Sequence, residues 1–364
     1  MTIDMNIRII TLLAAAAAAF CSCADAPQIS YPTAVAHRGC WVKDLIPENC
    51  PAGVRLAARY GFWAVECDVH YTADSVMVLM HDRTINRTMR LKEGYAPIPE
   101  PVKVSETTFE ELRSKYVLAS DDPELRTPIP TFAEELEACK ATGVIPMMHS
   151  SVQESYRLAK EVLGDGWICF MSEDENGAYA RSISDCLVLL DPGRDEAENV
   201  VKRLSAIGGK VGMSTMKHDM LKADYIKTIT DAGFETQSSI FPTPHEMDAI
   251  HDKASIILSD FVWFPRDGRK PVQTWKEKDR KFLAGEELGF KGSAYDFSGL
   301  TFTATFKGSV EITLSDGRSY TVTHEDYDTE TIGLRLHATE PSVTIKALED
   351  SDLKCCRADV YEIL

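Results

Sequence analysis

Short apolar runs alternate with longer amphipathic stretches from Thr33 to about Phe261. Such runs are typical of buried strands, and the amphipathic stretches are typical of helices that cover a sheet. This alternation predicts an α/β protein with a parallel sheet. Eight strands are predicted, at residues 35–36, 64–65, 144–145, 168–170, 186–190, 210–212, 235–236 and 256–258. Because helical stretches follow these strands, we expect a closed (β/α)₈ TIM barrel.

The stretches with helical spacing are 50–60, 132–141, 151–163, 196–207, 223–232 and 244–251. The segment at about 83–131 has no place in a minimal barrel unit, and its prolines indicate irregular structure. We predict that it is an inserted cap that walls a ligand cleft. The barrel domain, including this insertion, is expected to span residues 30–268.

After Pro265 the helical pattern fades, and short alternating strands are predicted as far as Ile363. The runs 312–314 and 320–322 flank Asp316-Gly317, a dipeptide that is typical of tight hairpins. Further runs lie at 334–336 and 343–345. We therefore predict a second domain at 275–364, a small antiparallel β-sandwich.

Residues 1–23 have the pattern of an export signal. A weakly basic start at 5–8 precedes an apolar stretch at 9–20 that is too short to span a membrane. Cys21 and Cys23 follow this stretch, which is similar to a bacterial lipoprotein signal with Cys23 as the lipidated residue. The alternative is an ordinary cleaved signal. We expect an exported protein that is membrane-anchored only through this lipid, in the periplasm or at the cell surface, and otherwise periplasmic.

The formal net charge of −17 argues against nucleic acid or an anionic membrane surface as a partner. A phosphate-bearing ligand would have to be attracted locally, by a metal and an arginine inside a cleft. The cysteines after the signal show no zinc-type spacing with histidines, so we expect most of them to be buried thiols. A disulfide between Cys40 and Cys50 is possible but not required.

Two carboxylates are the first candidates for chemistry. Glu66 and Asp68 lie at the end of a predicted strand, where TIM barrels carry their sites. They are two positions apart, so on an extended strand both project to one face and can share a divalent cation.

Two histidines and an arginine complete the set. His37 and Arg38 follow the first predicted strand, and the apolar run 76–80 delivers His81 to the same end of the barrel. One histidine can take a proton while the other gives one, and an arginine can bind a phosphate through two hydrogen bonds. Together with the carboxylates, these residues indicate a metal-assisted phosphodiesterase.

The ordered motifs resemble the glycerophosphodiester phosphodiesterase family from Val35 to about Pro265. They are His37-Arg38-Gly39, Pro47-Glu48-Asn49, Glu66-Cys67-Asp68-Val69, His81-Asp82, Arg87-Thr88, Phe109-Glu110-Glu111-Leu112, Ile129-Pro130-Thr131-Phe132-Ala133-Glu134 and Ile257-Leu258-Ser259-Asp260. The resemblance implies a metal-dependent barrel in which His37 and His81 are the general acid and base. It also implies that Arg38 binds phosphate. Glu66 and Asp68 would ligate Ca²⁺ or Mg²⁺.

The third strand departs from the family pattern. Family members usually offer a glutamate ligand and a nearby lysine there, but this chain has neither in residues 146–151. His149 is the candidate replacement ligand, and imidazole suits Zn²⁺ or Mn²⁺ better than Ca²⁺ or Mg²⁺. Gln237-Ser238-Ser239 stands where family members commonly have a tryptophan, so we expect a different substrate wall. Structural roles are expected for His70, His218, His245, His251, His324 and His337.

From these observations we expect hydrolysis of a glycerophosphodiester-like small molecule to an alcohol and a phosphomonoester. A first alternative is a catalytically impaired barrel that serves as a surface binding protein for phosphoglycerol or glycan ligands. A second alternative is an enzyme similar to the phosphatidylinositol-specific phospholipases C, for which a cyclic phosphate product would be diagnostic.

Overall fold

The structure, a computed structural model, describes residues 33–215, 223–239, 254–260, 262–265 and 268–364. The predicted signal and lipid anchor at 1–23 and the predicted helix at 244–251 lie outside these residues. His218, His245 and His251 lie outside them as well. Among the described residues, no helix combines the length and apolar character needed to cross a membrane.

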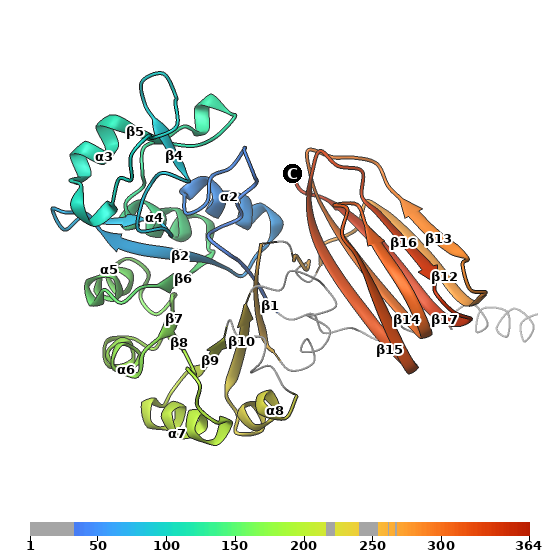
Figure 1. Cartoon of the computed structure of the whole chain (residues 1–364). Helices are drawn as coiled ribbons and strands as arrows, with labels where there is room; N and C mark the ends of the chain where they lie inside the picture. Colours follow the sequence, from blue (N-terminus) through green and yellow to red (C-terminus); the bar gives the residue numbers. More distant parts are fainter. Residues whose placement is uncertain (1–32, 216–222, 240–253, 261, 266–267) are drawn as a thin grey trace, which may run out of the picture. The chain divides into compact units, whose positions relative to one another are not determined.

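Parallel strands close into a barrel, and Figure 1 labels these strands except β11. Their order around the barrel is β1 (Thr33–Ala36), β2 (Ala64–Tyr71), β6 (Ile145–His149), β7 (Ile168–Ser172), β8 (Leu187–Leu190), β9 (Val211–Thr215), β10 (Glu235–Ser239) and β11 (Ile256–Ser259). Strand β1 pairs in parallel with both β11 and β2, so the sheet has no free edge at this point. The predicted TIM barrel is confirmed, and each predicted strand overlaps an observed one.

Helices cover the outside of the barrel, as Figure 1 shows for α5 to α7. The barrel helices are α2 (Pro51–Tyr60), α4 (Phe132–Thr142), α5 (Gln153–Leu163), α6 (Asp174–Ile183), α7 (Ala197–Ile207) and α8 (Ala223–Asp231). Thr131 and Glu134 form a reciprocal capping box that begins α4. Helix α6 is not among the stretches named from the sequence, and it contains Gly177, a residue of low helical propensity. A Cβ at Gly177 would lie 2.8 Å from the Leu190 side chain, so close packing on β8 requires glycine there.

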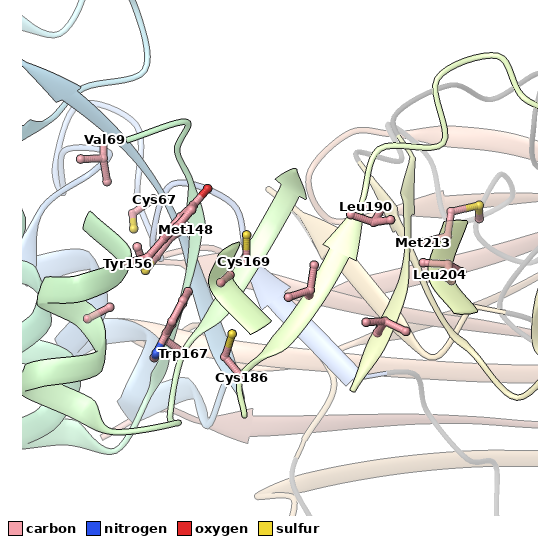
Figure 2. Packing of buried hydrophobic residues seen from close by; sticks show 14 of the residues in the cluster. Cys67, Val69, Met148, Tyr156, Trp167, Cys169, Cys186, Leu190, Leu204 and Met213 are labelled. Carbon is pink, nitrogen blue, oxygen red and sulfur yellow. The ribbon is translucent and has the colours of Figure 1, made fainter. Parts of the chain in front are cut away.

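Side chains alternate between the two faces of each barrel strand. The main core fills the space between strands and helices, and Figure 2 shows part of it, with Cys67 and Met148 on the strands and Trp167 beside them. Ala64 instead belongs to a smaller cluster inside the barrel. Since Glu66 shares the face of Ala64, the strand delivers this carboxylate to the barrel interior.

The insertion after strand β3 (Met77–Leu79) is more regular than predicted. It contains β4 (Met89–Leu91), η1 (Val104–Glu106), α3 (Phe109–Lys115), β5 (Tyr116–Leu118) and η2 (Pro123–Leu125). Strands β4 and β5 pair with each other in an antiparallel ribbon, apart from the barrel sheet. The insertion is therefore a small ordered lobe between β3 and α4.

The C-terminal strands form one antiparallel sheet with its own core. They are β12 (Gln273–Phe282), β13 (Glu287–Lys291), β14 (Phe297–Leu314), β15 (Ser319–His337), β16 (Ser342–Ala347) and β17 (Ser351–Glu362). The long strand β14 pairs with β17 along its first part and with β16 along its last part, while β15 lies on its other edge. The hairpin predicted at Asp316-Gly317 joins β14 to β15.

Two aromatic residues connect the barrel to this sheet. The Tyr60 hydroxyl at the end of α2 donates to the carbonyl oxygens of Ser298 and Leu336, at 3.1 Å each. Trp263 Nε1 donates to the Tyr60 carbonyl oxygen at 2.7 Å. A Cβ at Gly299 would lie 2.1 Å from the Trp263 ring, so the indole packs directly against the backbone of β14. The contact between the barrel and the C-terminal sheet therefore involves both hydrogen bonds and close packing.

Candidate active site

His37 follows β1 and is held by a carboxylate from the neighbouring strand end. Its Nδ1 lies 2.8 Å from Asp260 Oδ1, and Trp41 Nε1 donates to the same oxygen at 3.0 Å. An ionised carboxylate at Nδ1 favours the tautomer whose Nε2 is free to accept a proton. Sequence analysis placed Asp260 in a strand motif but not among the site residues, because only the closure of the barrel brings β11 beside β1.

Arg38 has a left-handed backbone with φ of 54°. Its amide donates to Glu66 Oε2 at 2.9 Å, and its carbonyl accepts from the Asn49 amide at 2.8 Å. A non-glycine residue in this region costs about 1 kcal/mol or more, and surrounding hydrogen bonds must hold it there. These hydrogen bonds therefore fix the backbone of Arg38 and the direction in which its side chain points.

Glu66, Asp68 and His149 come together as predicted. One ligand atom from each lies within 4.8 Å of the others. His149 Nδ1 lies 3.3 Å from Asp68 Oδ1, and Asn49 pairs reciprocally with Asp68 through two hydrogen bonds of 3.0 Å. Asn49 therefore supports Asp68, a role that its place in the Pro47-Glu48-Asn49 motif did not predict.

The two carboxylates differ in their affinity for protons. Burial, followed by the charge of Asp68, raises the pKa of Glu66 well above its usual range. Burial also acts to raise the pKa of Asp68, but hydrogen bonds from His149 and Asn49 outweigh it and the pKa is lowered. Two buried acids this close repel each other when both are ionised. A divalent cation would relieve this repulsion, and two carboxylates with one imidazole fit such an ion.

His81 is delivered to the site by the run after β3. The Met80 amide donates to the Asp68 carbonyl oxygen at 3.1 Å, which ties this run to β2. His81 Nδ1 lies 2.7 Å from Asp82 Oδ1, so His81 is oriented by a carboxylate in the same way as His37. Hydrogen bonds from Arg87, followed by that from His81, lower the pKa of Asp82 to about 2 against the effect of burial.

Glu48 connects the two arginines of the site. Arg87 donates to both of its oxygens, at 2.8 and 2.7 Å, and Arg38 Nη1 lies 3.3 Å from Oε1. Arg38 Nε is buried and has no hydrogen-bond partner among the described residues. Glu48 therefore holds one end of the Arg38 guanidinium group, while Nε lies 4.0 Å from Asp68 Oδ2.

A cavity of about 380 Å³ opens beside these groups. It is lined by Asp68, Val69, His70, Tyr71, His81, His149, Ser150, Ser151, Val152, Met171, Ser172, Glu173 and Asn176. His70, for which the sequence predicts a structural role, is among the residues that line this cavity. Residues 83–131 contribute no side chain to the lining of this cavity, while Arg87 of the insertion binds Glu48 of the site. That the insertion walls a ligand cleft stays a prediction.

Two further sequence expectations concern Gln237 and a disulfide between Cys40 and Cys50. Gln237 is fully buried, accepts a hydrogen bond from Ser214 and donates to Ser239 Oγ at 2.8 Å. It does not line the described cavity. Cys40 and Cys50 are buried free thiols, so the disulfide that the sequence left open is not formed.

Sequence comparison finds relatives for the first half of the barrel. Residues 37–163 match the profile of the glycerophosphoryl diester phosphodiesterase family. Human glycerophosphodiester phosphodiesterase 1 is 35% identical over 112 residues, which cover 29% of this chain and 30% of that protein. A probable glycerophosphodiester phosphodiesterase 1 from Mycobacterium tuberculosis is 42% identical over 65 residues, or 18% of this chain and 23% of that protein. The chain thus spans less than a third of the length of these curated relatives.

Structure comparison supports the fold over a longer range. A phosphodiesterase from Oleispira antarctica, solved with its product sn-glycerol-3-phosphate, has a TM-score of 0.50 and 19% identity over 63% of this chain and 93% of its own. A protein from Silicibacter pomeroyi assigned to the glycerophosphoryl diester phosphodiesterases has a TM-score of 0.51 and 16% identity, over 64% and 90%. At these identities the likeness concerns the fold alone. The resemblance drawn from the motifs is confirmed over residues 37–163, which match the profile of the glycerophosphoryl diester phosphodiesterase family.

Proposed function

We propose that this chain hydrolyses a glycerophosphodiester-like phosphodiester to an alcohol and a phosphomonoester. The observation that carries the proposal is a pair of histidines, His37 and His81, each hydrogen-bonded through Nδ1 to a carboxylate. Both follow strands at the end of the barrel that holds Glu66 and Asp68. A protein that only binds its ligand needs no such pair of proton carriers.

The proposal includes a divalent cation. Glu66, Asp68 and His149 would hold it, and it would supply Lewis-acid activation of the phosphoryl group and of the attacking oxygen. Two carboxylates and an imidazole favour Mn²⁺ or Zn²⁺ over the Ca²⁺ or Mg²⁺ expected from the family resemblance. The His149 side chain is 47% exposed, which leaves it able to turn toward a ligand.

The two histidines divide the proton transfers. With Nδ1 engaged by Asp260, His37 presents Nε2, and His81 presents Nε2 in the same way beside Asp82. One removes the proton of the attacking water or hydroxyl, and the other protonates the leaving alkoxide. The guanidinium of Arg38 donates to a phosphoryl oxygen and stabilises the charge that develops there.

Product analysis tests this proposal against the two alternatives. Phosphorus NMR of glycerophosphodiesters incubated with the protein and each of the four divalent cations should show a phosphomonoester. A stable cyclic phosphate would indicate chemistry similar to that of the phosphatidylinositol-specific phospholipases C. Ligand binding without any product would indicate a binding protein and contradict the proposal.

A change of leaving group shows which histidine is the general acid and which is the general base. p-Nitrophenolate leaves without protonation, so a p-nitrophenyl diester should restore turnover in the variant that lacks the acid and not in the one that lacks the base. His37→Ala and His81→Ala are the two variants to compare. Equal loss of turnover with both substrates in both variants would contradict the division of roles.

We also propose export with a lipid anchor at Cys23. The support is the signal pattern of residues 1–23, which lie outside the described part of the chain. Cys23→Ser should move the protein from the membrane fraction to the soluble exported fraction, while Cys21→Ser should not. Equal distribution of both variants would contradict the anchor.

A further inference from the structure

Arg335 belongs to β15 of the C-terminal sheet, yet its side chain contacts the loop that carries His37. We call residues 37–41 the His37 loop. Arg335 Nη1 donates to Cys40 Sγ in this loop at 3.0 Å. Its guanidinium carbon also lies 5.4 Å from the centre of the Phe62 ring, a cation–π distance. The sheet therefore reaches the catalytic side of the barrel with a charged side chain.

The Arg335 guanidinium is partly buried. Its Nε and Nη2 atoms are buried and have no hydrogen-bond partner among the described residues. A partly buried cation with few hydrogen bonds is stabilised by nearby negative charge and by the face of an aromatic ring. Asp260 supplies such a charge: burial acts to raise its pKa, but hydrogen bonds from His37 and Trp41 and the charge of Arg335 lower it.

Backbone hydrogen bonds join Gly39 and Cys40 of the His37 loop to the barrel. The Gly39 amide donates to the Glu66 carbonyl oxygen at 3.0 Å, and the Cys40 amide donates to the Gly53 carbonyl oxygen at 3.2 Å. Both bonds use the backbone. The Cys40 side chain points to Arg335 instead, so the thiol links the loop to the sheet.

We propose that Arg335 is a positioning residue, through which the C-terminal sheet holds the His37 loop and the His37–Asp260 pair in place for proton transfer. This inference rests on the proposed phosphodiesterase function. It also gives the sheet a role in the barrel's chemistry, although none of its residues lines the described cavity. Because Arg335 does not touch the cavity, it should affect turnover rather than substrate binding.

The test compares Arg335→Gln and Arg335→Lys in the full-length chain. Arg335→Gln should lower kcat by about tenfold or more while KM changes less than about twofold, because even a small misplacement of a reacting group lowers the reaction rate strongly. Arg335→Lys keeps the positive charge and should recover part of kcat. Arg280→Gln is the matched control, because Arg280 lies over the Phe282 ring in the same sheet, 4.9 Å from its centre.

Wild-type kcat and KM in a folded Arg335→Gln variant would overturn the inference. If that variant does not fold, Cys40→Ala removes the thiol acceptor from the barrel side, and it should lower kcat in the same way. Unchanged kcat in Cys40→Ala would then overturn the inference.

A second readout separates this inference from the proposed function. The proton between His37 and Asp260 should give a low-field NMR resonance in the wild type, and this resonance should shift or broaden in Arg335→Gln. If the wild type hydrolyses no phosphodiester, the proposed function fails, and the resonance still tests the positioning role. A resonance unchanged in Arg335→Gln would overturn that role.

Discussion

At the scale of single residues, the site depends on side chains that orient other side chains. Asp260, Asn49 and Glu48 each hold a group that the chemistry would use. The sequence predicted the groups themselves, because His37 and Glu66 stand at strand ends in a recognisable order. It did not predict Asp260 as a partner of His37, since the two are 223 positions apart and only barrel closure joins them.

Asp260→Asn tests whether the negative charge of Asp260 is needed to orient His37. The amide keeps nearly the same shape but cannot favour the His37 tautomer with a free Nε2, so kcat should fall by about 10²-fold or more. KM and thermal stability should change little. Steady-state kinetics would check this, with the exposed Asp224→Asn on α8 as a control. Wild-type kcat in Asp260→Asn would contradict the assigned orientation.

At the scale of elements, the apolar pattern was sufficient to predict every barrel strand and all but one of the barrel helices in the described residues. It did not name α6, where Gly177 packs closely against the side chains of β8 although helical propensity disfavours glycine. It also described the insertion as irregular, because short strands such as β4 and β5 are too brief to leave a periodic signal.

Helix α4 carries a buried acid that makes stability depend on pH. The Glu135 carboxyl oxygens have no hydrogen-bond partner among the described residues, and burial raises the pKa of this group to about 8 against the opposing charge of Arg55. The folded state therefore holds a proton that the unfolded chain releases near its usual pKa of 4.5. Its contribution to stability is complete below that value and is lost as the pH rises through about 8.

Glu135→Gln should remove this pH dependence. The variant should gain stability over the wild type as the pH rises from 5 to 8.5, on the order of 1.4 kcal/mol for each unit of pKa shift removed. Urea unfolding at both pH values would measure it. Glu137→Gln, at an exposed position of the same helix, should leave the pH dependence unchanged. A constant difference between Glu135→Gln and wild type would contradict the buried proton.

The junction of barrel and sheet gives a second prediction at this scale. Gly299→Ala would place a methyl group against the Trp263 ring and should destabilise the protein by about 1–3 kcal/mol or more. Gly289→Ala is the control, because its Cβ would meet Thr344 at an ordinary 3.5 Å. Thermal unfolding would compare them, and equal stability of the two variants would show that the indole does not pack there.

At the scale of the whole molecule, one end of the barrel gathers the histidines, the arginines and the carboxylates of the site. The sequence predicted this gathering from strand order, and it also predicted the C-terminal antiparallel domain. It could not predict that the sheet contacts the His37 loop, since Arg335 stands in an unremarkable strand pattern.

The donor set predicts which ion stabilises the molecule. Mn²⁺ or Zn²⁺ should raise the melting temperature of the protein freed of metal with a chelator more than Ca²⁺ or Mg²⁺ does, because His149 supplies a nitrogen ligand. His149→Ala should reduce this preference. A larger shift with Ca²⁺ or Mg²⁺ than with Mn²⁺ or Zn²⁺ would place His149 outside the ligand set.

The most direct measurement is the rate at which the protein lacking residues 1–23 releases phosphomonoester from a glycerophosphodiester. The protein is first freed of metal with a chelator, and the rate is measured before and after a divalent cation is added. We predict release only with the cation, and a fall of about 10²-fold or more in His37→Ala. Equal release without any cation, or equal release by His37→Ala, would contradict a metal-assisted phosphodiesterase with paired histidines.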